Sequence, residues 1–182
     1  MMFRFLRSLC LLAPVVMAAP AQAQVTLDMS KVTCIDYATM APEMRRDFIA
    51  WMSGWFNQKE GQTEINLRIM RTNIATMEQW CARNRDQRVM SLIEAASRNP
   101  GSAPGGPLSI DIAKVSCADY RASEAEGQFL LSAWIAGFVA SEKSQPRIDT
   151  KGFARIEQAT EAACKKNRKA LLMPTVKAQI KG

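Results

Sequence analysis

Cysteines are the residues of this chain whose spacing most clearly suggests chemistry. Cys34 and Cys81 are 47 residues apart, and Cys117 and Cys164 are separated by the same 47 residues. A fifth cysteine, Cys10, lies in an N-terminal apolar segment. If that segment is removed on export, four cysteines enter an oxidising compartment, where two disulfides are expected. Zinc binding is the weaker alternative, because the chain has no histidine and no C-x-x-C pair.

An internal repeat selects among the three pairings that four cysteines allow. Residues 27–37 (LDMSKVTCIDY) return as residues 110–120 (IDIAKVSCADY), at an offset of 83 residues. The same offset, without a gap, carries Trp51 onto Trp134, Gly54 onto Gly137, and Cys81 onto Cys164. Each copy therefore has its own cysteine pair, which predicts the disulfides Cys34–Cys81 and Cys117–Cys164. A closed loop of this length stabilises a small module by about 4 kcal/mol on the chain-entropy model.

The N-terminus has the pattern of a secretory signal peptide. Arg4 and Arg7 precede an apolar run over residues 8–19, and Ala21-Gln22-Ala23 forms a small-x-small cleavage site. The apolar run is shorter than the roughly 20 residues that span a bilayer. We expect cleavage after Ala23, a periplasmic protein and no transmembrane segment.

A hydroxyl three residues before a carboxylate begins each copy. Thr33 precedes Asp36, and Ser116 precedes Asp119, which is the capping-box spacing of a helix start with Asp in place of Glu. We interpret both carboxylates as helix caps rather than as general acids or bases.

The next helix of each copy carries a stripe of large apolar residues. Pro42 suits its first turn and Gly61 its end, and the steps of 3, 1, 3 and 1 between apolar residues predict one apolar face. The residues are Phe48, Trp51, Met52, Trp55 and Phe56 in the first copy and Leu131, Trp134, Ile135, Phe138 and Val139 in the second. Glycine costs roughly 1 kcal/mol in a helix relative to alanine, so the recurrence of Gly54 as Gly137 predicts close backbone approach. We interpret the stripe as core, as a module interface or as a concealed binding surface.

The remaining pattern completes an all-α fold of two tandem modules with about four short helices each. Further helices are expected over residues 72–83, 86–97, 154–166 and 168–179, with Pro174 bending or delaying the last one; residues 65–70 and 148–153 are expected as loops or irregular turns. The Pro- and Gly-rich residues 99–107 read as a linker. The predicted organisation is a leader (1–23), a first module (24–98), the linker (99–107) and a second module (108–182).

Composition argues against several classes of function. The net charge is +7, and loss of Arg4 and Arg7 with the leader lowers it to +5. The densest basic cluster, around Lys165 to Lys169, has no nucleic-acid motif beside it, so we expect a solvated helix end and no nucleic-acid partner. Without histidine, a nucleophile elbow or a phosphate loop, we expect no enzyme, no metal and no cofactor.

The chain resembles the HdeA/HdeB family of periplasmic acid-stress proteins. The resemblance rests on the exported V-T-C-I-D-Y opening at Cys34, the W-x-x-G-W helix at Trp51 and the W-C-A-R-N segment at Cys81, together with their second-copy counterparts at Cys117, Trp134 and Cys164. It covers about residues 27–97 and 110–180. Known members are single modules, whereas this chain has two.

This resemblance implies a small helical fold with one disulfide per module and a homodimer that dissociates and partly unfolds in strong acid. The exposed apolar stripe would then hold unfolding periplasmic client proteins against aggregation, with module–module packing replacing or accompanying the homodimer. Protonation of all 17 carboxylates would raise the side-chain charge of the mature chain from about +5 to about +22. The alternative is a periplasmic binding or adaptor module for one specific partner, in which acid has no role.

Overall fold

The computed structural model describes residues 26–97 and 109–180. The predicted leader (1–23) and linker (99–107) lie outside these described residues. The first copy consists, in order, of β1 (Thr26–Asp28), the 3-10 turn η1 (Met29–Lys31), α1 (Cys34–Thr39), α2 (Pro42–Lys59), β2 (Glu64–Asn66), α3 (Leu67–Arg83) and α4 (Val89–Ser97). The second copy consists of β3 (Ser109–Asp111), η2 (Ile112–Lys114), α5 (Cys117–Ala122), α6 (Ala125–Glu142), β4 (Arg147–Asp149), α7 (Thr150–Lys166) and α8 (Leu172–Lys177).

The prediction of an all-α fold with four helices per copy is confirmed. Both predicted capping boxes are present. The Thr33 hydroxyl accepts a hydrogen bond from the Asp36 backbone N–H, and the Asp36 carboxylate accepts one from the Thr33 N–H at 2.9 Å. Ser116 and Asp119 repeat this arrangement at the start of α5. Both carboxylates therefore act as helix caps.

The expectation of loops at residues 65–70 and 148–153 was wrong. Each segment holds the end of a three-residue strand and the first turn of a long helix. Asn66 starts α3, because its side chain accepts hydrogen bonds from the N–H groups of Arg68 and Ile69, and Asp149 caps α7 in the same way through Lys151. Asn and Asp are good N-caps, so the signal was present in the sequence. The last helix of each copy begins later than predicted, at Val89 and at Leu172, and Pro174 lies in the first turn of α8, where proline is tolerated.

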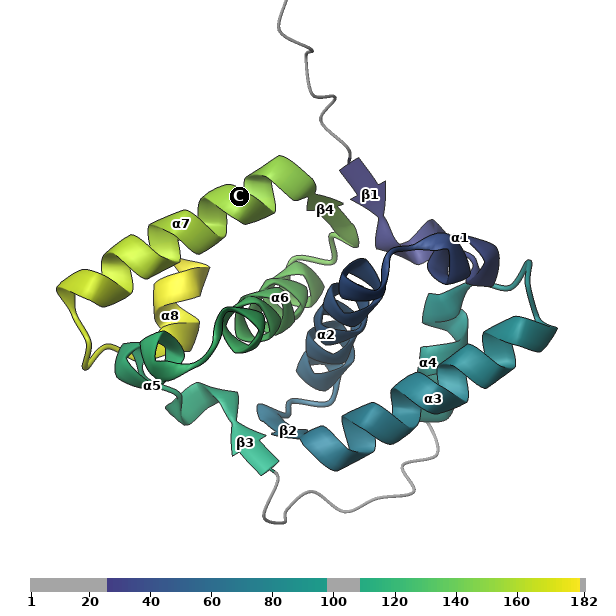
Figure 1. The fold of residues 1–182 in the computed structure, drawn as a ribbon, viewed down its shortest axis with the longest axis horizontal. Helices are drawn as coiled ribbons and strands as arrows, with labels where there is room; N and C mark the ends of the chain where they lie inside the picture. Colours follow the sequence, from purple (N-terminus) through teal and green to yellow (C-terminus); the bar gives the residue numbers. More distant parts are fainter. Residues whose placement is uncertain (1–25, 98–108, 181–182) are drawn as a thin grey trace, which may run out of the picture.

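The two copies are joined through a central helix pair and two small sheets. Figure 1 shows α2 and α6 side by side in the centre, with α3 and α4 outside α2, and α7 and α8 outside α6. Strand β1 pairs antiparallel with β4, and β2 pairs antiparallel with β3. Each sheet therefore takes one strand from each copy, and the sheets lie at opposite ends of the central helix pair (Figure 1).

The central helices end in the same way but with different residues. At the end of α2 the N–H groups of Gly61 and Gln62 bond to the carbonyls of Gln58 and Asn57, with Gly61 at φ 66°. The equivalent residue after α6 is Ser144, at φ 53°. The left-handed conformation is unfavourable for a residue with a Cβ atom, whereas glycine adopts it freely.

We therefore expect Ser144→Gly to raise the free energy of unfolding by about 1 kcal/mol. Gly61→Ser should lower it by a similar amount. Urea denaturation followed by circular dichroism measures both changes. A Ser144→Gly variant less stable than the parent chain would contradict this assignment.

Candidate functional site

The two central helices touch at their glycines. A Cβ atom built on Gly54 would overlap the carbonyl oxygen of Trp134 and lie 2.8 Å from its carbonyl carbon. A Cβ atom on Gly137 would overlap the carbonyl oxygen of Trp51 and lie 2.7 Å from its carbon. The predicted close backbone approach is thus observed, and it is reciprocal between α2 and α6. We call this contact, with the side chains around it, the α2–α6 interface.

The predicted apolar stripe lies inside the protein. Trp51 and Trp55 stack at 5.2 Å between ring centroids, and the equivalent Trp134 and Phe138 rings lie 5.3 Å apart. Nine of the ten stripe residues are buried and Leu131 is half-buried: Phe48, Trp51, Met52, Trp55 and Phe56 in α2, and Trp134, Ile135, Phe138 and Val139 in α6. In the folded chain this surface is therefore closed to any other protein.

The stripe is wider than the sequence pattern predicted. Ile49 and Ala50 of α2 and Ala133 and Ala136 of α6 are also buried, so these helices bury more than one face. One face packs in its own copy, and the other packs across the α2–α6 interface: Ala133 and Ala136 belong to the same apolar cluster as Trp51. A helical segment that is apolar on all sides is typical of a fully buried position. The steps of 3, 1, 3 and 1 along the stripe predicted only one apolar face, so they did not reveal this wider burial.

Residues in or next to the strands also pack in the apolar core of the other copy. Ile65 of β2 packs in the apolar cluster of the second copy, and Phe153 of α7 packs in the cluster of the first. Two equivalent backbone hydrogen bonds also join the copies. The Met29 N–H donates to the carbonyl of Pro146, and the Ile112 N–H donates to the carbonyl of Thr63. Neither apolar core is complete without residues of the other copy.

Few polar contacts support the α2–α6 interface. The Ser141 hydroxyl donates to Oε1 of Gln58 at 2.8 Å, and Arg46 of α2 pairs with Glu126 of α6, where both side chains are about half exposed. The buried indole nitrogens of Trp55 and Trp134 have no hydrogen-bond partner among the described residues. A buried donor without a partner costs about 1–3 kcal/mol. The α2–α6 interface itself is held mainly by apolar packing.

Four carboxylates at equivalent positions support the folded state only while ionised. A hydrogen bond from the Ser30 hydroxyl lowers the pKa of Asp28, and one from the Thr33 hydroxyl lowers the pKa of Asp36. Hydrogen bonds from Lys114 and Thr63 lower the pKa of Asp111, and the Ser116 hydroxyl lowers that of Asp119. Asp111 of β3 accepts a hydrogen bond from the Thr63 hydroxyl of the first copy, whereas Asp28 of β1 bonds to Ser30 of its own copy. Protonation of Asp111 therefore weakens one contact between the copies, and protonation of the two capping carboxylates weakens two helix starts.

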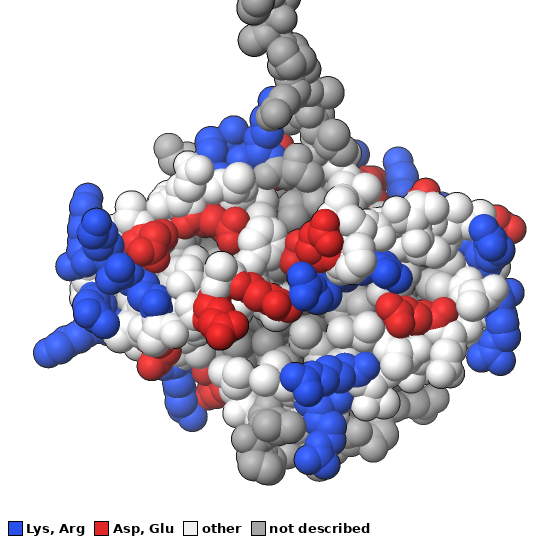
Figure 2. Space-filling view, in the orientation of Figure 1, with Lys and Arg blue, Asp and Glu red and all other residues white. Residues whose placement is uncertain are grey.

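Two other carboxylates behave in the opposite way. Burial, with the nearby Glu43 and Glu126 carboxylates adding to it and Arg46 opposing it, raises the pKa of Asp47 on α2 to about 6. Burial and the Asp47 carboxylate raise the pKa of Glu157 on α7. Figure 2 shows that Asp and Glu gather across the middle of the face in view, with Lys and Arg between and below them as well as at the left and right margins.

These pKa shifts predict a stability maximum in mild acid. As the pH falls from 7 through about 6, the folded chain binds a proton at Asp47 before the unfolded chain does, so the stability rises. The raised pKa of Glu157 acts in the same direction. Below the ordinary aspartate pKa of 3.8, the unfolded chain binds protons first at Asp28, Asp36, Asp111 and Asp119, so the stability falls. Thermal melting followed by circular dichroism at a series of pH values measures this profile. Asp47→Asn should flatten its rise between pH 7 and 5, and a melting temperature that falls steadily from pH 7 downward would contradict it.

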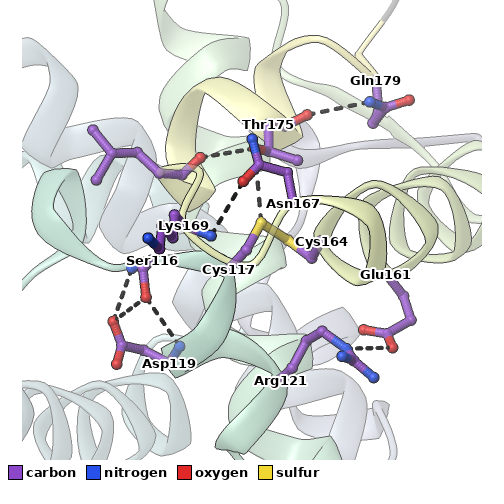
Figure 3. The surroundings of a disulfide bond; sticks show 11 residues. Ser116, Cys117, Asp119, Arg121, Glu161, Cys164, Asn167, Lys169, Thr175 and Gln179 are labelled. Atoms are coloured by element: carbon purple, nitrogen blue, oxygen red, sulfur yellow. Dashed lines mark hydrogen bonds and ion pairs between the residues drawn. A yellow bond between two sulfur atoms is a disulfide. The ribbon is translucent and has the colours of Figure 1, made fainter.

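The disulfides tie the outer helices of each copy together. Cys34 bonds to Cys81 and Cys117 bonds to Cys164, so the predicted pairing is confirmed. Figure 3 shows the second bridge joining the start of α5 to the end of α7, next to the Ser116–Asp119 cap and the Arg121–Glu161 ion pair. All four cysteines are buried. These covalent bonds do not titrate, so they persist in acid where the carboxylate contacts are lost.

Neither a metal-ligand cluster nor a membrane-spanning helix is found in the described part of the chain. In residues 26–97 and 109–180 no group of three or more His, Cys, Asp or Glu side chains is placed to hold a metal ion. None of the helices in these residues has the length and apolar character needed to cross a bilayer.

Comparison with known proteins finds one family. Residues 5–91 and residues 94–174 each match the model of the HdeA/HdeB family, one match for each copy of the repeat. A search of curated proteins and a search of solved structures each gave no match.

Proposed function

The chain belongs to the HdeA/HdeB family, and from this premise we propose that it is a periplasmic acid-stress chaperone, exported with cleavage after Ala23. In strong acid the two copies separate at the α2–α6 interface. The apolar stripe of α2 and α6 then holds unfolding periplasmic proteins and limits their aggregation. The two modules (24–98 and 108–182), joined by the linker (99–107), take the place of the two subunits of a homodimer.

The burial of the stripe in two cores that each include residues of the other copy is the observation that carries this proposal. Large apolar side chains such as Trp51 and Trp134 are almost fully buried in the folded chain, so they are available to a client only after the chain opens. A surface of this kind binds unfolded chains without sequence preference once it is exposed.

Acid has several effects on this interface. Protonation weakens the hydrogen bond from Thr63 to Asp111 and breaks the Arg46–Glu126 pair, and both of these contacts join the copies. It also raises the charge of the mature chain to about +22, so the two positively charged halves repel each other. The disulfides limit the expansion and favour refolding when the pH recovers.

Light scattering tests the proposal. Purified residues 24–182 are mixed at about pH 2, where carboxylates are protonated, with a protein that aggregates there, and an apolar dye reports exposed surface. We expect suppressed scattering and increased dye binding at that pH, and neither effect at pH 7. An unchanged fold with no suppression would contradict the proposal and favour an adaptor, which a single stoichiometric partner at neutral pH would support.

A further inference from the structure

The turn between α7 and α8 presents four positive charges to solvent. Lys165 and Lys166 end α7, Arg168 and Lys169 follow in the turn, and all four side chains are exposed. No ion pair of the described residues involves any of them. Figure 2 shows Lys and Arg gathered at the left margin of the molecule, where Figure 1 shows the end of α7. We call residues 165–171 the basic turn.

The backbone of the basic turn is fixed against the start of α5. The Ala118 N–H donates a hydrogen bond to the carbonyl of Arg168 at 2.8 Å. The Cys117 N–H donates in the same way to the carbonyl of Ala170, and the Cys117 sulfur is bonded to the end of α7 (Figure 3). The four charges are therefore displayed by an ordered backbone and not by a loose tail.

Leu171 adds an exposed apolar side chain to this turn. The chain is extended here, because Leu171 forms a β-bridge with Ser116 and the Leu172 N–H donates to the carbonyl of Val115. Side chains alternate in direction along an extended chain, so Leu172 points into the core and is fully buried, whereas Leu171 points outward and is 47% exposed. An apolar side chain thus lies in sequence two residues from the charge of Lys169.

The equivalent turn of the first copy is much less basic. Asp86 stands in place of Lys169, and Arg88 stands in place of Leu171. With the capping aspartate of each copy included, the first turn has three bases and two acids, whereas the second has four bases and one acid. An exposed isoleucine, Ile35, lies beside the first turn, so the two turns differ mainly in charge. The shared fold forms with either set of residues and does not require the excess of bases.

We propose that the basic turn of the second copy docks the protein on bilayers of anionic phospholipid. Its four bases attract the negatively charged headgroups, and each Lys or Arg close to such a surface adds to the affinity. Leu171 enters the boundary between headgroups and acyl chains, where apolar side chains of surface-bound proteins lie. A soluble polyanion would meet the same charges but would give Leu171 no apolar layer in which to be buried. This surface is independent of the chaperone function proposed above.

Cosedimentation of the mature chain (residues 24–182) with vesicles at pH 7 tests the proposal. The vesicles contain equal parts of phosphatidylcholine and phosphatidylglycerol, and vesicles of phosphatidylcholine alone are the neutral control. We expect saturable binding to the anionic vesicles and little binding to the neutral ones. Binding should weaken steeply as salt is added, because salt screens charges on exposed surfaces.

Two charge-matched variants locate the docking surface. Each loses three bases: Lys166→Gln/Arg168→Gln/Lys169→Gln in the second copy, and Arg83→Gln/Arg85→Gln/Arg88→Gln in the first. The second-copy variant should bind anionic vesicles at least about tenfold more weakly than the parent chain, and the first-copy variant should lose less than about threefold. All six side chains are exposed, so both variants should melt at the temperature of the parent chain.

Leu171→Gln separates a bilayer from a soluble polyanion. This variant should bind anionic vesicles about threefold or more weakly, because it loses apolar burial, and should bind polyphosphate as the parent chain does. Three results would overturn the proposal: no binding of the parent chain to anionic vesicles, an equal loss in the two charge variants, or unchanged vesicle binding by Leu171→Gln.

Discussion

Alanine in place of Gly54 or Gly137 is expected to open the protein at neutral pH. In an ordinary helix Gly→Ala stabilises by roughly 1 kcal/mol. Here the new methyl group would overlap the backbone of Trp134 or Trp51, and backbone atoms cannot move aside as a side chain can. Forcing α2 and α6 apart should cost about 3 kcal/mol, so each variant should lose about 2 kcal/mol net, as measured by urea denaturation.

A third glycine provides the matched control for this experiment. Gly127 lies in the first turn of α6, where an added Cβ atom would meet only the Ser123 side chain at 3.4 Å or more. Gly127→Ala should therefore be neutral or stabilise the chain by up to about 1 kcal/mol. The Gly54 and Gly137 variants should also bind an apolar dye at pH 7. If all three alanine variants were equally stable, the close contact between α2 and α6 would be refuted.

Loss of either disulfide is expected to have the largest effect on stability. Each bridge closes a loop with a sequence separation of 47 residues, which corresponds to about 4 kcal/mol on the chain-entropy model. The double variant Cys117→Ala/Cys164→Ala should lose about that much stability. Because each core contains residues of the other copy, melting should involve the first copy as well.

Circular dichroism with and without a reductant measures this effect for both bridges together. We expect the reduced chain to be largely unfolded at 37 °C and neutral pH. The Cys34→Ala/Cys81→Ala variant serves as the counterpart in the first copy and should melt similarly. Unchanged helical signal and melting temperature after complete reduction would contradict the assigned role of the bridges.

The repeat made a large part of the structure predictable. One offset of 83 residues linked the two cysteine pairs, the two capping boxes and the two helix glycines, and each assignment rested on local chemistry that acts in the same way in both copies. Thr33 and Asp36 contact each other within a single turn, so their spacing alone defines the contact. The glycine contact was predictable because glycine within a helix needs a compensating reason.

The exchange between the copies was not predictable from the same patterns. Strands of three residues such as β1 and β4 are too short to show an alternation of apolar and polar side chains, and their pairing depends on how two distant segments meet. A pocket between α2 and α3 was not predicted for a similar reason, because its lining residues Arg45 and Ile74 come from different helices. The stripe residues were identified, but their burial on several sides depends on the partner copy.

The central claim is that acid separates the two copies and exposes the surface that holds clients. It is tested most directly by measuring client holding with a chain whose copies are covalently linked across α2 and α6. Arg46→Cys/Glu126→Cys places two thiols at an exposed ion pair between α2 and α6, where a short bismaleimide can join them after the native disulfides have formed. The same variant blocked with N-ethylmaleimide is the unlinked control. At about pH 2, we predict that the unlinked chain suppresses the light scattering of an aggregating client and that the linked chain suppresses it much less. Equal suppression by both chains would show that the surface between α2 and α6 is not the one that holds clients.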